Sequence, residues 1–248
     1  MCCYNRDSTP RMTERRTLRV ERLGRVEYGA ALDIQKATER AVLSGAQADT
    51  LLLLEHPHVL TMGRRSAPGA IIAPENVLTA RGVNVFETNR GGKVTYHGLG
   101  QVIGYPIINL SPDREDVHRF VRDLEEVLIR TMKDFGIEAF RIAGLTGVHT
   151  EQGKVAAIGV HIARWVTTHG FALNVNTDLS YFDLIIACEG EPVTSMHELL
   201  GREIQLSEVE DRIIERFAEV FEMDEVATAP GTDLIVCNAD TRLNQTSC

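Results

Sequence analysis

Glycines, cationic residues and hydrogen-bonding side chains are concentrated in residues 90–101, which read Arg-Gly-Gly-Lys-Val-Thr-Tyr-His-Gly-Leu-Gly-Gln. Glycine lets a backbone adopt positive φ and approach a bound molecule closely. Arg90 and Lys93 could hold an anion, while Tyr96 and His97 could orient a ligand through hydrogen bonds. A glycine-rich stretch between two strands is also typical of a plain hairpin turn. These residues alone therefore leave two interpretations open, a binding loop and a structural turn.

A candidate nucleophile is Cys188, which follows the apolar run 184–187 and precedes the polar run 189–192. A thiol with a pKa of about 8.5 is mostly protonated at neutral pH, so attack requires a nearby cation or base. Lys154 could supply that charge, because it opens the apolar segment 155–160. Both residues also have ordinary interpretations: a lone cysteine is often a buried hydrophobic residue, and such a lysine often reaches out to solvent.

The order of apolar segments indicates which elements would position these residues. We expect residues 155–165 and 168–175 to form a hairpin of two strands. We also expect residues 94–96 to pair with residues 102–109 across the glycine segment, residues 90–101. Pro106 should then lie at a sheet edge or a bulge. A helix over 207–221 should begin with Ser207 as its cap. An antiparallel or mixed sheet with helices packed on it is the fold class that this order favours. The other predicted helices are 30–44, 75–81 and 113–135, and the other predicted strands are 50–55, 59–62, 83–88 and 140–142.

Length, composition and charge limit the kinds of protein that this chain could be. The chain has 248 residues, 44% of them hydrophobic, which is enough to build the core of one globular domain. We expect this domain to span residues 17–227, with a flexible segment at 1–16 and a loose tail at 228–248. A net charge of −9 without a basic run argues against a nucleic-acid partner. The sequence has neither a membrane-length apolar stretch nor a signal core, and its five cysteines lack metal or disulfide spacing. We therefore expect a cytoplasmic protein with no metal and no membrane association.

Four segments resemble, in order, the signature of the octanoyltransferases that begin lipoate biosynthesis. They are 90–101, 154–160 (Lys-Val-Ala-Ala-Ile-Gly-Val), 168–176 (Thr-His-Gly-Phe-Ala-Leu-Asn-Val-Asn) and the stretch from Cys188 to Val193-Thr194-Ser195-Met196. Several motifs at compatible spacing over residues 50 to 200 are far more specific than one glycine pattern. The resemblance implies an α/β fold with a mixed, largely antiparallel sheet and packed helices, like the catalytic domain of biotin and lipoate protein ligases.

The resemblance also implies the site and the reaction. Cys188 would take the acyl chain as a thioester, and Lys154 would lower the pKa of the thiol and shuttle its proton. The octanoyl group would come from octanoyl-acyl carrier protein and pass to a lysine of lipoyl domains, those of 2-oxoacid dehydrogenase E2 subunits and of the glycine cleavage H protein, without a cofactor. Small residues would leave room for the eight-carbon chain. The implied substrate-binding residues are Arg90, Gly91, Gly92, Lys93, Val94, Thr95, Tyr96, His97, Ala157, Ile158, Gly159, Gly170, Phe171 and Ala172.

Two other functions remain open at this point. ATP-dependent lipoate or biotin ligases are similar in fold but do not need the cysteine, and a degenerate homologue could bind lipoyl domains without acylating them. The second alternative is motivated by departures from the family pattern: Glu189 follows the cysteine directly, and His149 stands where the family usually has tryptophan. Because the proposed partners are acidic like the chain itself, docking should depend on a few cations at the site, for which the candidates are Arg64, Arg65, Arg90 and Lys93.

Overall fold

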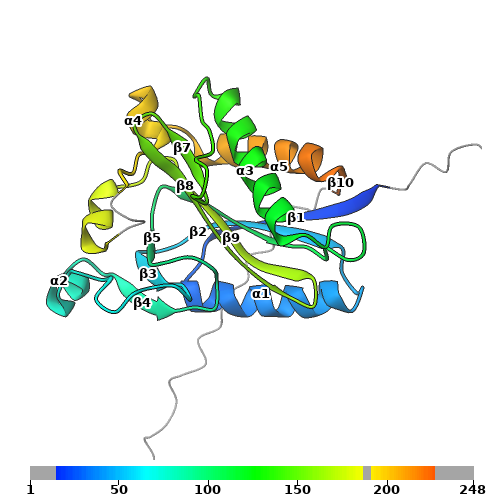
Figure 1. Ribbon diagram of the computed structural model, residues 1–248, viewed down its shortest axis with the longest axis horizontal. Helices are drawn as coiled ribbons and strands as arrows, with labels where there is room; N and C mark the ends of the chain where they lie inside the picture. Colours follow the sequence, from blue (N-terminus) through cyan, green and yellow to red (C-terminus); the bar gives the residue numbers. More distant parts are fainter. Residues whose placement is uncertain (1–14, 187–190, 227–248) are drawn as a thin grey trace, which may run out of the picture.

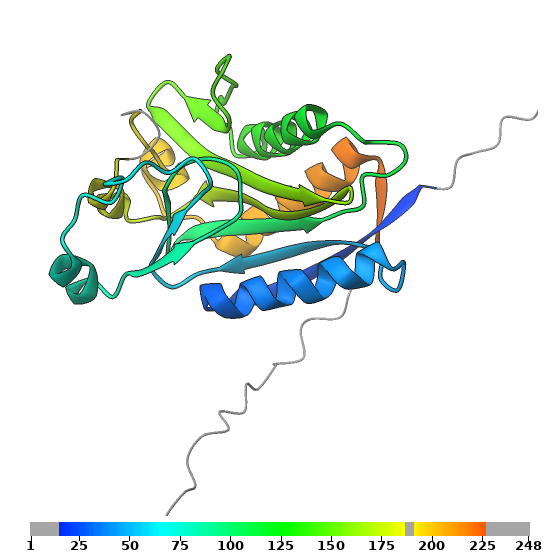
Figure 2. The ribbon, with the colours of Figure 1, turned by 60° about the horizontal axis from the view of Figure 1, so that its bottom comes forward.

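The computed structural model describes residues 15–186 and 191–226, which form two sheets with helices on both faces of the larger one (Figures 1 and 2). The larger sheet contains β1 (Arg16–Arg25), β2 (Asp49–Glu55), β6 (Gln101–Ile107), β7 (Val148–Thr150), β8 (Gly153–Ala163), β9 (Val166–Asn174) and β10 (Met223–Val226). Its strand order is β10-β1-β2-β6-β9-β8-β7. Among the described strands of this sheet, β1 pairs in parallel with β2 and with β10, and the other pairs are antiparallel. The mixed, largely antiparallel fold class is therefore confirmed.

The smaller sheet lies at one end of the larger one and carries the glycine segment. It consists of β3 (Val59–Met62), β4 (Asn84–Glu87) and β5 (Thr95–His97), in the order β4-β3-β5. The short helix α2 (Glu75–Ala80) and the 3-10 helix η1 (Leu179–Leu184) accompany it. Leu60 and Tyr96 of this sheet share a small core with Leu184 and Ile185. This core connects the small sheet to the chain that leads toward Cys188.

Helices cover the larger sheet because β2 is apolar on both sides. Leu51 and Leu53 belong to the core under α3 (Val117–Asp134) and α5 (Leu206–Phe221), whereas Leu52 and Leu54 belong to the core under α1 (Tyr28–Leu43). The α3 helix begins where the Asp116 carboxylate accepts the Arg119 N–H. Figure 2 shows α1 on one side of the sheet and α3 on the other. The remaining helix, α4 (Met196–Leu200), follows the segment that pairs with β8.

Shortening a buried leucine side chain of β2 should lower the stability of the fold strongly. Leu53 is fully buried, so Leu53→Ala removes transfer free energy and leaves a cavity, which costs about 2–5 kcal/mol of unfolding free energy. Ile72 is 57% exposed, so Ile72→Ala should change stability by less than about 0.5 kcal/mol. Urea denaturation of both variants measures the difference. Equal unfolding free energies would contradict the central place of β2 in the core.

The predicted β8–β9 hairpin is confirmed, and its turn falls at Arg164 and Trp165, where both φ values are positive. The predicted pairing of 94–96 with 102–109 is wrong. A turn at 98–100 sends the chain from one sheet to the other, so β5 pairs with β3 while β6 pairs with β2 and β9. Pro106 lies in this central strand rather than at an edge. The β6–β9 ladder stops at Gly104 and resumes as a bridge at Asn109. Between these points Pro106 has no N–H to donate, and His169, opposite it in the register, has a positive φ and donates its N–H to the Gln35 side chain.

Other differences concern short or edge elements. Residues 140–142 contribute only the Phe140–His149 bridge, and the strand next to β8 is β7 instead. Ser207 lies inside α5, whose cap position is Gln205 without a side-chain hydrogen bond, so the predicted serine cap is wrong. Sequence reasoning missed β1, β7, β10, α4 and η1. Within the described residues, no helix has the length and apolar character needed to cross a membrane.

Candidate active site

Arg90 anchors the glycine loop, residues 90–95, onto β3. Its buried guanidinium donates to the Thr61 carbonyl at 2.6 Å and to the Thr61 hydroxyl at 2.8 Å. Gly63 lies so close that a Cβ there would meet the guanidinium at 2.7 Å and the Gly92 carbonyl at 2.5 Å. Arg90 is only 7% exposed, which corrects its assignment as a docking residue. Its side chain instead supports the loop from beneath.

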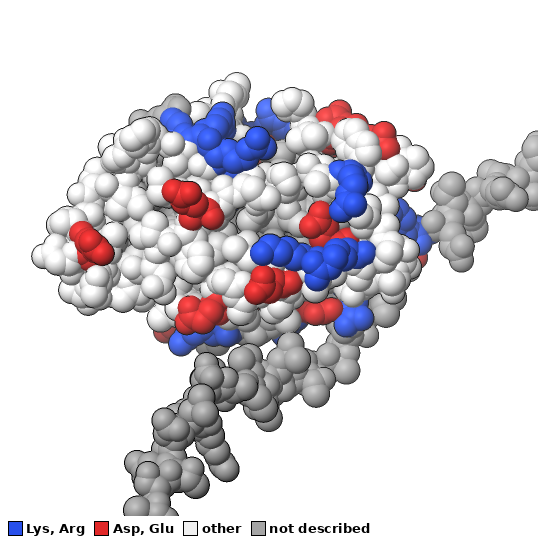
Figure 3. All heavy atoms as spheres, turned by 90° about the horizontal axis from the view of Figure 1, so that it is seen from below, with Lys and Arg blue, Asp and Glu red and all other residues white. Residues whose placement is uncertain are grey.

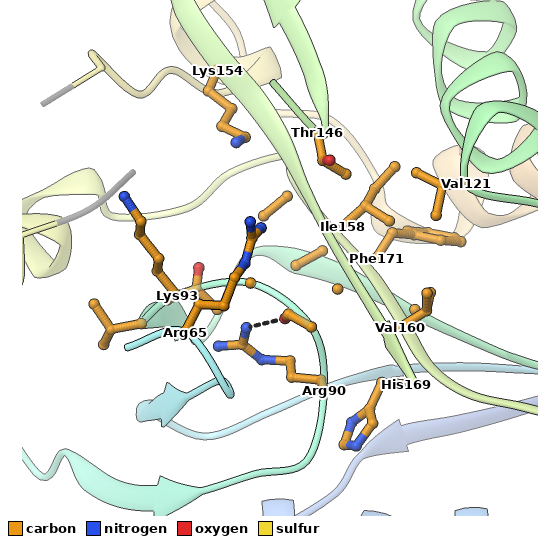
Figure 4. A pocket seen from close by; sticks show the side chains of 18 of the residues that line it. Arg65, Arg90, Lys93, Val121, Thr146, Lys154, Ile158, Val160, His169 and Phe171 are labelled. Carbon is orange, nitrogen blue, oxygen red and sulfur yellow. Dashed lines mark hydrogen bonds between the residues drawn. The ribbon is translucent and has the colours of Figure 1, made fainter. Parts of the chain in front are cut away.

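The loop also contacts the free side of β8. The β7 ladder ends at Ala156, and beyond it the Gly91 N–H donates to the Val160 carbonyl at 2.9 Å. Gly159 permits this approach, since a Cβ there would meet the Gly91 carbonyl at 2.8 Å. The loop and β8 thus form two walls of a cavity of about 380 Å³ (Figure 4). Residues 144–146 and the first turns of α3 form the rest of its apolar side.

Small residues on β8 and β9 face each other across the hairpin at this cavity. Ala157 is opposite Ala172, and Gly159 is opposite Gly170. The structure brings most of the predicted binding residues together here, and those lining the cavity are Arg90, Gly91, Gly92, Lys93, Val94, Thr95, His97, Lys154, Ala157, Ile158, Gly159, Gly170, Phe171 and Ala172. Lining residues that sequence reasoning did not select include Tyr28, Tyr105, Val117, Val121 and Glu191. Val117 and Val121 were visible only as part of the apolar face of a predicted helix.

Tyr96 differs from the other predicted residues. Its ring is fully buried and stacks on Tyr181 at a centroid distance of 4.9 Å, and its hydroxyl lies 2.7 Å from Nδ1 of His58. It contacts only an adjoining cavity of about 20 Å³, room for about one water molecule. In this structure the Tyr96 hydroxyl is therefore engaged within the protein and does not line the main cavity, so its expected ligand-orienting hydrogen bond stays a prediction.

Buried histidines line the inner end of the main cavity. His97 lies within 3.3 Å of both the Thr61 hydroxyl and the Gln101 side-chain oxygen, and burial lowers its pKa well below the usual value. Nε2 of His169 lies 2.8 Å from Oδ1 of Asn89; burial and then Arg90 lower the pKa of His169 to about 4. Both imidazoles are neutral at physiological pH. They offer hydrogen-bonding groups rather than positive charge to the cavity.

Lys154 reaches the cavity from the opposite end. Its side chain is directed into the same space as those of Lys93 and Arg65, which come from the other side (Figure 4). Gly147 makes room for it, since a Cβ there would lie 2.6 Å from Cε of Lys154. Nζ of Lys154 is 4.0 Å from Oε2 of Glu191. The structure therefore places the Lys154 amine in the lining of the cavity, beside the Glu191 carboxylate.

Cys188 lies outside the described residues, as does Glu189, but the segments on either side are held near Lys154 and the small sheet. The Lys154 N–H donates to the Pro192 carbonyl at 2.8 Å, and the Thr194 N–H donates to the Lys154 carbonyl at 3.0 Å. On the other side, the Ile186 N–H donates to the Ala70 carbonyl at 2.8 Å. Among residues 15–186 and 191–226, no group of three His, Cys, Asp or Glu side chains could hold a metal ion.

Comparison with known proteins identifies the class of this catalytic domain. Residues 27–218 match the family described as the lipoyl protein ligase A/B catalytic domain. A bi-partite lipoate protein ligase from Thermoplasma acidophilum has a similar fold, with a TM-score of 0.66 and 17% identity over 86% of this chain and 88% of that one. The matched region therefore defines a lipoyl protein ligase A/B catalytic domain, and the solved ligase has a similar fold.

Relatives at higher identity narrow the assignment. The octanoyltransferase of Solibacter usitatus is 49% identical over 87% of this chain and 96% of its own length. The octanoyltransferase of Chloroflexus aurantiacus is 47% identical over 84% of this chain and 96% of its own length. The chain belongs to the octanoyltransferase family and is an acyltransferase of lipoate biosynthesis.

Proposed function

We propose that the enzyme transfers an octanoyl group from octanoyl-acyl carrier protein to a lysine of a lipoyl domain through a thioester on Cys188. The observation that carries this proposal is the position of Lys154, whose amine enters a cavity walled by small residues while its backbone pairs with the chain just after Cys188. The small residues on β8 and β9 fit a slender saturated chain. The amine supplies the positive charge that a thiolate requires.

The reaction needs two exchanges. The Cys188 thiolate attacks the carbonyl carbon of the donor thioester, the bond to the carrier thiol breaks, and the departing thiolate takes a proton from Lys154. An acceptor lysine, as its free amine, then attacks the enzyme thioester. An amide bond forms, the Cys188 thiolate leaves, and Lys154 accepts the proton that the amine loses. No ATP is consumed, because converting a thioester into an amide is downhill.

We propose lipoyl domains of 2-oxoacid dehydrogenase E2 subunits and the glycine cleavage H protein as acceptors, and the cytoplasm as the compartment. Support for lipoyl domains comes from the Thermoplasma acidophilum ligase of similar fold, which was described together with its E2 lipoyl domain. We also retain the domain division proposed above, with one catalytic domain over 17–227. The described elements from β1 to β10 fall within that range, apart from the first residue of β1.

Intact-protein mass spectrometry after mixing the enzyme with octanoyl-acyl carrier protein tests the proposal. Wild type should gain one octanoyl group that hydroxylamine removes and that disappears when a lipoyl domain is added. Cys188→Ser should form at most a hydroxylamine-resistant ester. Absence of an adduct and of acceptor modification would contradict the proposal. Acceptor modification that requires ATP and free octanoate would identify a ligase instead. Binding of lipoyl domains without any transfer would indicate a non-catalytic homologue.

Carrier docking should depend on Arg65, which is exposed and lines the cavity. Figure 3 shows Lys and Arg side chains gathered along the upper part of one face of this acidic protein. Arg65→Glu should raise the KM for octanoyl-acyl carrier protein by about fivefold, and the wild-type KM should rise with salt because exposed charges are screened. Arg212→Glu on α5 is the matched control. A KM independent of both salt and Arg65 would contradict electrostatic docking.

A further inference from the structure

Beside the Lys154 amine lies a polar cluster that has no part in the mechanism proposed for Cys188 and Lys154. His149 of β7 pairs with Lys154 across the β7–β8 ladder, and its imidazole is turned inward with 2% of the residue exposed. Nε2 of His149 is 3.5 Å from Oε2 of Glu191, the same carboxylate oxygen that lies 4.0 Å from Nζ of Lys154. Glu191 therefore stands between the imidazole and the amine.

Hydrogen bonding in this cluster is incomplete. Within the described part of the chain, neither ring nitrogen of His149 nor Oε2 of Glu191 has a hydrogen-bond partner. Buried polar atoms without partners are rare in native proteins, and where they persist they call for an explanation. A small side-chain rotation would turn the 3.5 Å approach into a hydrogen bond from the imidazole to the carboxylate.

The charges around His149 favour a hydrogen bond in which its imidazole N–H donates to the Glu191 carboxylate. The charged groups that face it are Lys154 from β8, Glu191 from the segment after residue 190 and Glu125 from α3. Burial and then the Lys154 charge lower the pKa of His149 and outweigh the opposite effect of Glu191 and Glu125, so the imidazole is neutral and keeps one N–H. Glu125 is already engaged by Arg122, Arg141 and the Gly147 N–H. Glu191 is thus the carboxylate available to His149.

We propose that His149 is a positioning residue for Lys154 that acts through Glu191. The imidazole N–H holds the Glu191 carboxylate against the lysine amine, and the carboxylate fixes the direction in which the amine enters the cavity. A lysine side chain has four rotatable bonds, so an enclosed carboxylate anchor removes conformations in which the amine points away. The catalytic consequence rests on the proposed function of Lys154.

Two replacements of His149 separate positioning from packing. His149→Phe keeps a planar ring without a donor and should lower kcat for octanoyl transfer about tenfold, with KM for the carrier protein unchanged. His149→Gln retains an N–H donor and should recover most of the loss. Glu191→Gln should lower kcat to a similar extent, and His149→Phe should add little in that background. His118→Phe, an exposed histidine on α3, is the control.

Alkylation of Cys188 by iodoacetamide provides a readout that does not require transfer. Its pH profile should move to higher pH in His149→Phe and return toward wild type in His149→Gln. Equal losses in both variants, additive losses in the double variant, or unchanged kcat would each overturn the positioning role. If wild type alkylates as expected but transfers no octanoyl group, the proposed function fails while the alkylation shift still tests His149.

Discussion

Replacing Lys154 with glutamine should lower octanoyl transfer by about three orders of magnitude, the usual contribution of a well-placed proton-transfer group. The side chain enters the cavity, where its amine would both stabilise the Cys188 thiolate and exchange a proton with each leaving or attacking group. Glutamine keeps most of the length and the hydrogen-bonding capacity but has no charge. Steady-state transfer of octanoyl groups to a lipoyl domain measures the loss, and Lys36→Gln on exposed α1 controls for removal of a surface lysine.

Lys154→Arg distinguishes the two roles of the amine. Arginine keeps the positive charge but remains protonated, so it cannot act as a proton acceptor. Cys188 alkylation should therefore stay close to wild type while transfer remains low. If Lys154→Arg restored transfer fully, the amine would serve only as a charge. If Lys154→Gln transferred at the wild-type rate, Lys154 would have no catalytic part.

Local sequence patterns predicted the elements that carry the site but not the contacts between them. Long apolar runs around a two-residue turn specified the β8–β9 hairpin, and that hairpin placed Ala157 opposite Ala172. The pairing across residues 90–101 could not be predicted, because the turn at 98–100 leads from one sheet to the other and the contact with β8 joins Gly91 to Val160. Periodicity within a segment carries no information about such a distant partner.

Local sequence patterns also could not predict the polar cluster of His149, Glu191 and Lys154, because it depends on contacts between distant segments. His149 and Glu191 are far apart in sequence, and no single local motif contains both of them together with Lys154. They become a candidate unit only because the Lys154 backbone pairs on one side with β7 and on the other with the segment around Val193. Arg90 shows the converse: a cation in a loop predicted surface docking, yet the fold buries it against Thr61.

Enlarging Ala157 should change which acyl chain the enzyme accepts. Ala157 lines the cavity and already carries a Cβ, whereas any side chain at Gly159 would push against the Gly91 carbonyl and displace the glycine loop. Ala157→Leu adds three carbons to the wall, and displacing about three methylenes of the octanoyl chain costs about 2.4 kcal/mol, or about fiftyfold in kcat/KM. Butanoyl transfer should be nearly unchanged, because a chain shorter by four carbons does not extend to the filled region.

Competition between octanoyl and butanoyl acyl carrier protein for one lipoyl domain measures this change directly, since the product ratio reports relative kcat/KM. Ala163→Leu, further along β8 and outside the cavity lining, is the matched control and should preserve the preference for octanoyl. Equal losses for both chains in Ala157→Leu would mean that the substitution disturbs the hairpin rather than the acyl site. An unchanged ratio would place the chain elsewhere in the cavity, against the apolar side formed by Val117, Val121 and Phe171.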